Sequence, residues 1–212
     1  MKKYYISLLV IFILCSLNIY LYIHFKSFKN KTATYLKATE YNNERTIILQ
    51  TNIEASIQNA GYSIKNTVLK DSCNQKQLLS HIQIKNKYLF ICFFSELDCE
   101  SCVNYSIQTL LPWCEDIGYE NILFIGQYRN NKLFYQQLPL YNLKSASVYN
   151  SYGLNLPLKD LGYPFYLILD ESYKIVEVYI PSKGNYNTDQ YFLQLLNTHF
   201  FPNKNKDEMI IG

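Results

Sequence analysis

Residues 87–102 have the sequence KYLFICFFSELDCESC, and this stretch decides the fold. Residues 87–94 form an apolar run without a polar face, which is typical of a strand buried on both sides in a sheet that helices cover. A short polar turn follows, and Cys99 and Cys102 then open a segment with apolar residues at helical spacing. A strand that leads into a helix opened by two cysteines favours a redox site at the end of that strand.

The chain around this stretch alternates between strand and helix patterns. The predicted strands are 62–69, 87–94, 121–126, 145–149, 163–170 and 174–180. The predicted helices are a short one at 75–82, one after Cys102 with a kink at Pro112, and others at 131–137 and 188–201. The last two strands form a hairpin around residues 171–173. This order predicts an α/β fold with a mixed sheet and helices on both faces.

The N-terminal region predicts a membrane anchor. Residues 4–25 are apolar apart from four positions, and a helix of that length crosses a hydrocarbon core of about 30 Å. A cleaved signal peptide is the alternative, because Lys2 and Lys3 give a charged start. The apolar run is longer than a usual signal core, however, and no small-x-small cleavage site follows it.

The sequence divides into four predicted parts. Residues 1–30 are the membrane anchor, and residues 31–61 are a juxtamembrane helix that Gly61 ends. Residues 62–202 are the α/β domain, and residues 203–212 are a polar tail.

The charge and the glycine content exclude several classes of function. The formal net charge is +3, but Lys2, Lys3, Lys26, Lys29 and Lys31 all precede the first acidic residue, Glu40, and residues 32–212 carry −2. A nearly neutral body gives no electrostatic footprint for nucleic acid. Only seven glycines are present, which argues against a glycine-built phosphate loop. The sequence predicts no cofactor and no metal.

The spacing of Cys99 and Cys102 favours thiol-disulfide exchange. Two cysteines across the first turn of a helix lie within disulfide reach, and the first points at unsatisfied backbone N–H groups that favour its thiolate. We therefore predict that Cys99 attacks a substrate disulfide and that Cys102 resolves the mixed disulfide.

A zinc site and a structural disulfide are the alternatives for the cysteine pair. A single Cys-x-x-Cys pair supplies half of a zinc site, and the complete site needs a second pair of ligands. No such pair is present, because the spacing does not occur among Cys73, Cys92, Cys114 and His81. A purely structural disulfide is disfavoured because such short loops are strained. Cys92 and Cys114 are predicted to be core thiols, and Cys73 lies in a loop.

The buried strand, the Cys-x-x-Cys helix start and the proline-led strand at 164–170 resemble the thioredoxin superfamily. Within it, the separation of Cys102 from Pro164 and the N-terminal anchor are similar to membrane-tethered bacterial thiol-disulfide oxidoreductases related to cytochrome-maturation thioredoxins. The resemblance covers residues 62–200. It implies a thioredoxin-like fold preceded by a transmembrane helix.

The resemblance also implies two substrate-binding residues. Pro164 is expected to be a cis-proline that faces the disulfide, and Tyr163 to lend backbone groups to the bound substrate. From the sequence alone, Pro164 is equally an ordinary trans proline that opens an edge strand. The sequence departs from the family at Asp98, where a tryptophan is usual, and it has no buried acid within residues 87–94.

The resulting hypothesis is an enzyme that reduces or exchanges disulfides in cell-envelope proteins. It takes a protein thiol or disulfide as substrate and needs a transmembrane electron donor or acceptor. The expected location is a single-pass membrane protein with its domain on the extracytoplasmic (periplasmic) side, where disulfides persist. The alternatives are a thioredoxin-fold binding or assembly module with a non-catalytic pair and a copper-handling protein, whose relatives use a wider cysteine spacing.

Two carboxylates next to Cys99 predict a low reduction potential for the cysteine pair. Asp98 precedes the cysteine and Glu100 follows it, so both are expected to oppose its ionisation. The alternative is that both carboxylates point into solvent and are screened, which leaves the thiol untouched. A less stabilised thiolate lowers the reduction potential, which suits a reductant. The expected potential is nearer about −270 mV, as in thioredoxin, than about −120 mV, as in a strong oxidant.

Overall fold

The computed structural model describes residues 2–143, 147–157 and 162–202, with the backbone alone at residues 2–14 and Glu44. Contacts divide the chain into two units, residues 1–47 and 48–212, and helix α1 (Lys2–Asn59) contributes to both. Across the described residues, no helix is both long and apolar enough to cross a membrane. The predicted span at 4–25 falls partly on side chains that lie outside the described part.

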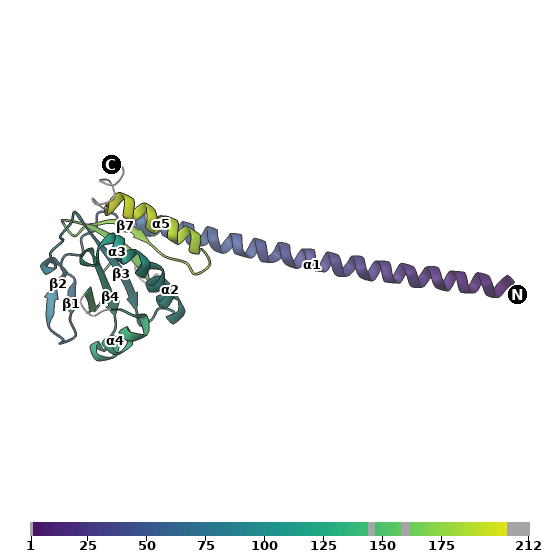
Figure 1. Ribbon diagram of the computed structural model, residues 1–212, viewed down its shortest axis with the longest axis horizontal. Helices are drawn as coiled ribbons and strands as arrows, with labels where there is room; N and C mark the ends of the chain where they lie inside the picture. Colours follow the sequence, from purple (N-terminus) through teal and green to yellow (C-terminus); the bar gives the residue numbers. More distant parts are fainter. Residues whose placement is uncertain (1, 144–146, 158–161, 203–212) are drawn as a thin grey trace, which may run out of the picture. The chain divides into compact units, whose positions relative to one another are not determined.

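The second unit consists of a sheet and the helices that pack on it (Figure 1). The strands are β1 (Val68–Lys70), β2 (Lys76–Leu78), β3 (Tyr88–Ser95), β4 (Ile122–Gln127), β5 (Val148–Ser151), β6 (Phe165–Asp170) and β7 (Ile175–Tyr179). Besides α1, the α-helices are α2 (Glu100–Leu110), α3 (Cys114–Ile117), α4 (Asn131–Gln137) and α5 (Tyr186–Phe200). Four 3₁₀ turns are described at Leu79–His81, Leu111–Trp113, Tyr119–Asn121 and Leu138–Tyr141.

The described strands form a mixed sheet in the order β2-β1-β5-β4-β3-β6-β7. Strand β3 lies near the centre, pairs parallel with β4 from Phe90↔Ile122 onward, and pairs antiparallel with β6. Strands β6 and β7 form the predicted hairpin. The apolar run at the start of the quoted stretch is thus a strand with neighbours on both edges, and the prediction of a mixed sheet is confirmed.

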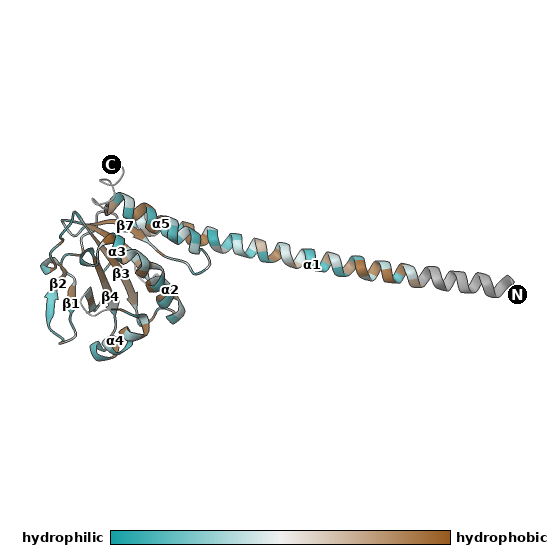
Figure 2. Ribbon diagram, viewed as in Figure 1, coloured by the Kyte–Doolittle hydropathy of each residue, from teal (hydrophilic) through white to brown (hydrophobic). Residues whose placement is uncertain are grey.

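Both faces of β3 are buried, in two separate cores. Its side chains alternate between the faces, as pleated strands require, and the apolar colour along β3 and β4 in Figure 2 reflects this burial. One core takes Phe90, Cys92 and Phe94 of β3 with Val103, Ile107 and Leu110 of α2 and Leu193 and Leu196 of α5. The other takes Leu89, Ile91 and Phe93 with Ala55 of α1 and Ile64, Leu79, Leu154 and Leu156. Helices therefore contribute to both faces, although α2 to α5 share one of them.

The end of α1 is anchored to β7 and to Ile180, the residue after it, by side-chain hydrogen bonds. The Asn52 amide donates to the Ile180 carbonyl at 3.2 Å, and the Ile180 N–H donates to Asn52 Oδ1 at 2.6 Å. Ser56 donates to Glu177 Oε1 at 2.8 Å. The helix stops at Asn59, and Gly61 then adopts a φ of 74°, the left-handed conformation expected of a helix-ending glycine.

Gly126 lets α4 approach strand β4. A Cβ added at this position would lie 2.1 Å from Cε2 of Phe134, so only glycine leaves room for the ring. Phe134 is fully buried and belongs to the same core as Phe94.

Three predicted elements differ from the structure. The helix predicted at 75–82 is wrong, because residues 76–78 form strand β2, which hydrogen-bonds to β1, and only a 3₁₀ turn follows. Of the strand predicted at 62–69, only the end, residues 68 and 69, is a strand, as part of β1. The strand predicted at 145–149 begins later, at Val148, and residues 144–146 lie outside the described residues, as does the predicted polar tail at 203–212.

Candidate active site

The loop between β3 and α2 is a tight turn that presents Cys99. The Ser95 N–H donates to Asp98 Oδ2 at 2.7 Å, and the Asp98 N–H donates to the Ser95 carbonyl at 3.2 Å. The Glu96 N–H donates to the Gln127 carbonyl at the end of β4 at 3.1 Å. These bonds fix the loop at the carboxyl ends of two parallel strands, which is where α/β sheets place their sites.

Cys99 is the N-cap residue of α2. Its sulfur accepts a hydrogen bond from the Cys102 N–H at 3.3 Å and lies 3.2 Å from Ser101 Oγ. Cys99 is exposed and Cys102 is half-buried, and both are free thiols. The structure thus brings the two predicted cysteines together across the first turn of a helix, with the first one open to solvent.

The two thiols differ in acidity. Hydrogen bonds from the Cys102 side chain, then from Ser101, lower the pKa of Cys99 to about 7. Burial, then the hydrogen bond and charge of Cys99, raise the pKa of Cys102 to about 11. At neutral pH, Cys99 is therefore partly a thiolate while Cys102 keeps its proton, which suits an attacking and a resolving thiol.

The predicted effect of the neighbouring carboxylates is wrong. The groups that set the pKa of Cys99 are Cys102 and Ser101, and neither Asp98 nor Glu100 is among them. Asp98 turns back to bind the Ser95 N–H, and burial raises its pKa above the ordinary value. The side-chain hydrogen bonds of Cys102 and Ser101 have the largest effects on the Cys99 sulfur, whereas the Asp98 carboxylate has its partner in the loop.

Replacing Ser101 with alanine tests the role of this hydroxyl. The variant should raise the pKa of Cys99 above about 7, because one hydrogen bond to the sulfur is lost while that from Cys102 remains. The rate of Cys99 alkylation by iodoacetamide, followed across pH by mass spectrometry, measures the shift. Ser172→Ala, in the exposed turn after β6, is the control. An unchanged titration in Ser101→Ala would show that this hydroxyl does not stabilise the thiolate.

Tyr163 and Pro164 lie directly before β6. Every described peptide bond is trans, so the expected cis bond before Pro164 is wrong. A trans bond is the default for X–Pro, and the match to the family motif alone favoured cis. Phe93 pairs with Phe165, so the antiparallel register puts Pro164 level with Phe94, one residue before the cysteine loop. The substrate-binding role of these two residues stays a prediction.

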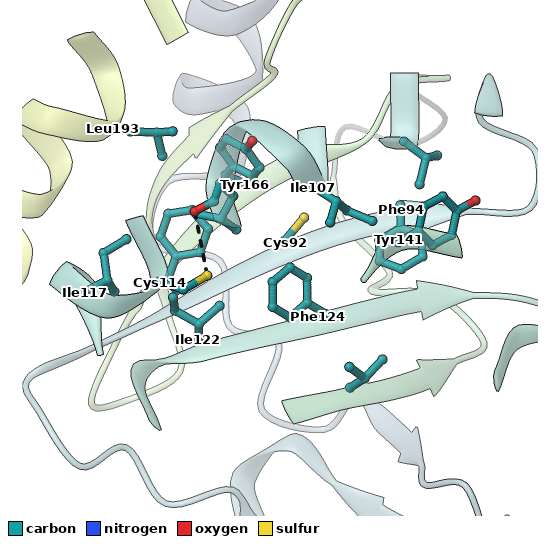
Figure 3. Close-up of a cluster of buried hydrophobic side chains, with 14 of the residues drawn as sticks. Cys92, Phe94, Ile107, Cys114, Ile117, Ile122, Phe124, Tyr141, Tyr166 and Leu193 are labelled. Carbon is teal, nitrogen blue, oxygen red and sulfur yellow. Dashed lines mark hydrogen bonds between the residues drawn. The ribbon is translucent and has the colours of Figure 1, made fainter. Parts of the chain in front are cut away.

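The remaining cysteines separate into buried and exposed ones. Cys92 and Cys114 are fully buried in the core that Figure 3 shows, and the Cys114 thiol donates to the Leu110 carbonyl at 3.7 Å. Burial raises the pKa of Cys92 far above its ordinary value and that of Cys114 to about 12, so both are unreactive core thiols, as predicted. Cys15 and Cys73 are exposed. In the part of the chain with described side chains, no three His, Cys, Asp or Glu residues cluster as metal ligands.

A hollow of about 290 Å³ lies beside the cysteine loop. Glu96, Asp98 and Glu100 contribute acidic groups to it, and Tyr128 and Tyr141 contribute aromatic ones. Arg129 pairs with Glu96 at 3.4 Å. Tyr128 and Tyr141 are buried, whereas Leu133 and Leu140 at the same hollow are exposed, so the surface beside the cysteine loop is acidic and apolar.

Asp189 is a buried carboxylate that sequence reasoning missed. It is fully buried, and it accepts hydrogen bonds from Tyr105 of α2 at 2.6 Å, from Tyr179 of β7 at 2.6 Å and from the Ser182 N–H at 3.1 Å. A signal was present, because Asp189 lies four residues before Leu193 on the inward stripe of α5. A carboxylate on that stripe needs partners inside the fold.

The sheet order and the cysteine pair define the class of fold. Strands β5, β4 and β3 pair in parallel and are continued by the antiparallel β6-β7 hairpin, and Cys-x-x-Cys opens the helix that follows β3, which is a thioredoxin-like arrangement. This assignment rests on the strand order, the register and the place of the cysteines.

Comparisons with known proteins find only distant similarity, to solved structures. No protein-family model matches the sequence, and no curated protein matches it significantly. Among solved structures, the thioredoxin domain of a thiol-disulfide oxidoreductase from Bacteroides vulgatus is 16% identical, with a TM-score of 0.45 over 63% of this chain and 97% of that one. A thiol:disulfide interchange protein from Bacteroides sp. is 16% identical, with a TM-score of 0.41 over 65% and 93%. BsSco, a member of the Sco family of cytochrome c oxidase assembly proteins, is 9% identical, with a TM-score of 0.45 over 66% and 95%.

Proposed function

We propose that the protein is a thiol-disulfide oxidoreductase that reduces or exchanges disulfides in cell-envelope proteins. The observation that carries this proposal is the difference between the two thiols at the start of α2. Cys99 is exposed with a lowered pKa, whereas Cys102 is half-buried with a raised one. A structural pair has no need of this asymmetry, while an exchange reaction uses it.

The reaction has two steps. The Cys99 thiolate attacks one sulfur of a substrate disulfide, forms a mixed disulfide and releases the other substrate sulfur as a thiolate, which takes a proton from water. Cys102 then loses its proton to solvent and attacks the Cys99 sulfur. The Cys99–Cys102 disulfide forms, the second substrate sulfur leaves, and two electrons have passed from the protein to the substrate.

Reduction of insulin disulfides by the reduced full-length protein tests the activity. Equilibration with glutathione buffers of known ratio then gives the reduction potential. A pKa of about 7 for Cys99 equals that of thioredoxin, and strong oxidants lie near 3.5, so we expect a potential near about −270 mV. The low value is expected because the thiolate is only moderately stabilised, and not because of Asp98 and Glu100. A potential near about −120 mV would contradict the reductant assignment.

We also propose that residues 4–25 anchor the protein in a membrane, with the body on the extracytoplasmic side. Exposed apolar side chains at Leu17, Ile19 and Leu21 support an apolar environment there. An extracytoplasmic reductant needs electrons from a transmembrane donor, which we expect as a partner.

A fusion experiment tests this location. Alkaline phosphatase fused after Gly212 should be active, because it needs the disulfides that form outside the cytoplasm. A matched fusion to a fluorescent protein that folds only in the cytoplasm should be dark. The opposite pattern would place the body in the cytoplasm.

A further inference from the structure

The segment between β7 and α5 carries Lys183 and is held by one buried carboxylate. The Ser182 N–H donates to Asp189 Oδ2 at 3.1 Å, and the Asn185 N–H donates to the Ser182 carbonyl at 2.8 Å. The Asp189 N–H donates to the Asn185 carbonyl at 3.0 Å. Lys183 is exposed but lies between residues whose backbones are fixed.

The same carboxylate ties this segment to the helix that carries the cysteines. Asp189 Oδ2 accepts from the Tyr105 hydroxyl at 2.6 Å, and Oδ1 accepts from Tyr179 at 2.6 Å. Tyr105 follows Cys102 by three residues on α2, and side chains three apart are neighbours on one helix face. The oxygen that binds the backbone next to Lys183 therefore also binds the turn of α2 adjacent to Cys102.

Cys102 lies in an environment that opposes its ionisation. Burial has the largest effect, and the hydrogen bond and charge of Cys99 add to it. Two groups act in the other direction, the Ser101 hydroxyl and the positive charge of Lys183. Lys183 is the one cation among these groups. Cys102 must nevertheless become a thiolate in the second step of exchange, so a cation nearby has a direct chemical use.

We propose that Asp189 and Tyr105 are positioning residues that hold Lys183 beside Cys102, where its ammonium group stabilises the thiolate that resolves the mixed disulfide. This inference rests on the proposed function. The Cys102 proton goes to solvent, the thiolate forms the bond to Cys99 Sγ, and the Cys99–substrate bond breaks. Lys183 keeps its own proton throughout and acts only through its charge.

A two-phase reaction with Ellman's reagent isolates the resolving step. In full-length protein with Cys15→Ser and Cys73→Ser, the reduced form should release one thionitrobenzoate when Cys99 attacks and a second when Cys102 resolves. Stopped-flow absorbance across pH gives the midpoint of each phase. The buried Cys92 and Cys114 should not react with the reagent on this timescale.

Lys183→Met should move the midpoint of the second phase upward by about half to one pH unit. Below the midpoint, this shift slows resolution about threefold to tenfold. Lys183→Arg keeps the charge and should keep the midpoint, and added salt should shrink the difference between wild type and Lys183→Met. Lys174→Met, the same charge loss in the β6–β7 turn, is the matched control and should leave both phases unchanged.

Asp189→Asn should shift the second phase in the same direction although Lys183 is intact. The amide replaces one carboxylate oxygen with a donor, so it cannot accept from all three partners. Adding Lys183→Met to Asp189→Asn should have little further effect, because the two changes remove one interaction. Circular dichroism checks the fold, and Tyr105→Phe gives the same test if Asp189→Asn does not fold.

The outcomes separate this inference from the proposed function. A wild type that releases only the Cys99 thionitrobenzoate does not resolve, and the proposed function fails. A wild type that releases both, with the same second-phase midpoint in Lys183→Met, leaves the function standing and overturns the role of Lys183. A shift in Lys183→Met without one in folded Asp189→Asn or Tyr105→Phe overturns the positioning role.

Discussion

Cys99→Ser is expected to abolish disulfide exchange, with a loss of roughly three orders of magnitude or more, as removal of a nucleophile gives in other enzymes. Cys99 is the exposed thiol, and the hydrogen bonds of the α2 terminus lower its pKa to about 7. Cys102→Ser should instead keep the first attack and trap the substrate as a mixed disulfide on Cys99. Non-reducing electrophoresis and mass spectrometry of the trapped species measure both effects and identify the natural substrate.

The matched control is Cys73→Ser, which removes an exposed thiol outside the pair and should leave exchange unchanged. Three results would contradict the assignment. Full activity in both Cys99→Ser and Cys102→Ser would make the pair non-catalytic and would favour a binding or assembly module. Trapping by Cys99→Ser alone would reverse the two roles. Loss of exchange in Cys73→Ser would add a third thiol to the reaction.

The part of the fold that follows from the sequence is the part with a periodic signal. The apolar run of β3 and the apolar spacing after Cys102 each indicate directly which residues are buried, and the sequence predicts these elements. At residues 75–82 it predicts a helix instead, because Leu78, Leu79 and Ile82 share a helical face. Hydrogen bonding to β1 makes this segment a strand, and the local sequence does not show which strand it will pair with.

The site is predictable to a similar degree. The cysteine spacing and the helix start identify Cys99 and Cys102, because their chemistry depends on local geometry. The direction of the Asp98 carboxylate depends on the loop, and its bond to the Ser95 N–H removes it from the sulfur. Asp189 lies more than eighty residues along the chain from Cys102, so only the folded sheet brings it to Tyr105 of α2.

Phe94→Ala is the substitution that we expect to destabilise the fold most among those considered. Phe94 is fully buried, and its ring contacts those of Phe134 and Tyr141, with centroids 6.0 Å away in each case, and that of Tyr128 at 6.3 Å. Truncating a buried phenylalanine to alanine costs about 3–5 kcal/mol, because apolar contacts are lost and a cavity remains. That is a large part of a typical stability of about 5–15 kcal/mol.

Urea unfolding measures this cost, and the chain's one tryptophan, Trp113, packs against the same core and serves as the fluorescence probe. The Leu133→Ala control truncates a side chain of α4 that is 53% exposed, and its unfolding free energy should change by no more than about 0.5 kcal/mol. Because Ser95, which binds Asp98 in the cysteine loop, directly follows Phe94, the loss of packing should also loosen this loop. We therefore expect the pKa of Cys99 in folded Phe94→Ala to rise from about 7 toward its ordinary value. A variant as stable as Leu133→Ala would show that the aromatic cluster does not support the end of β3.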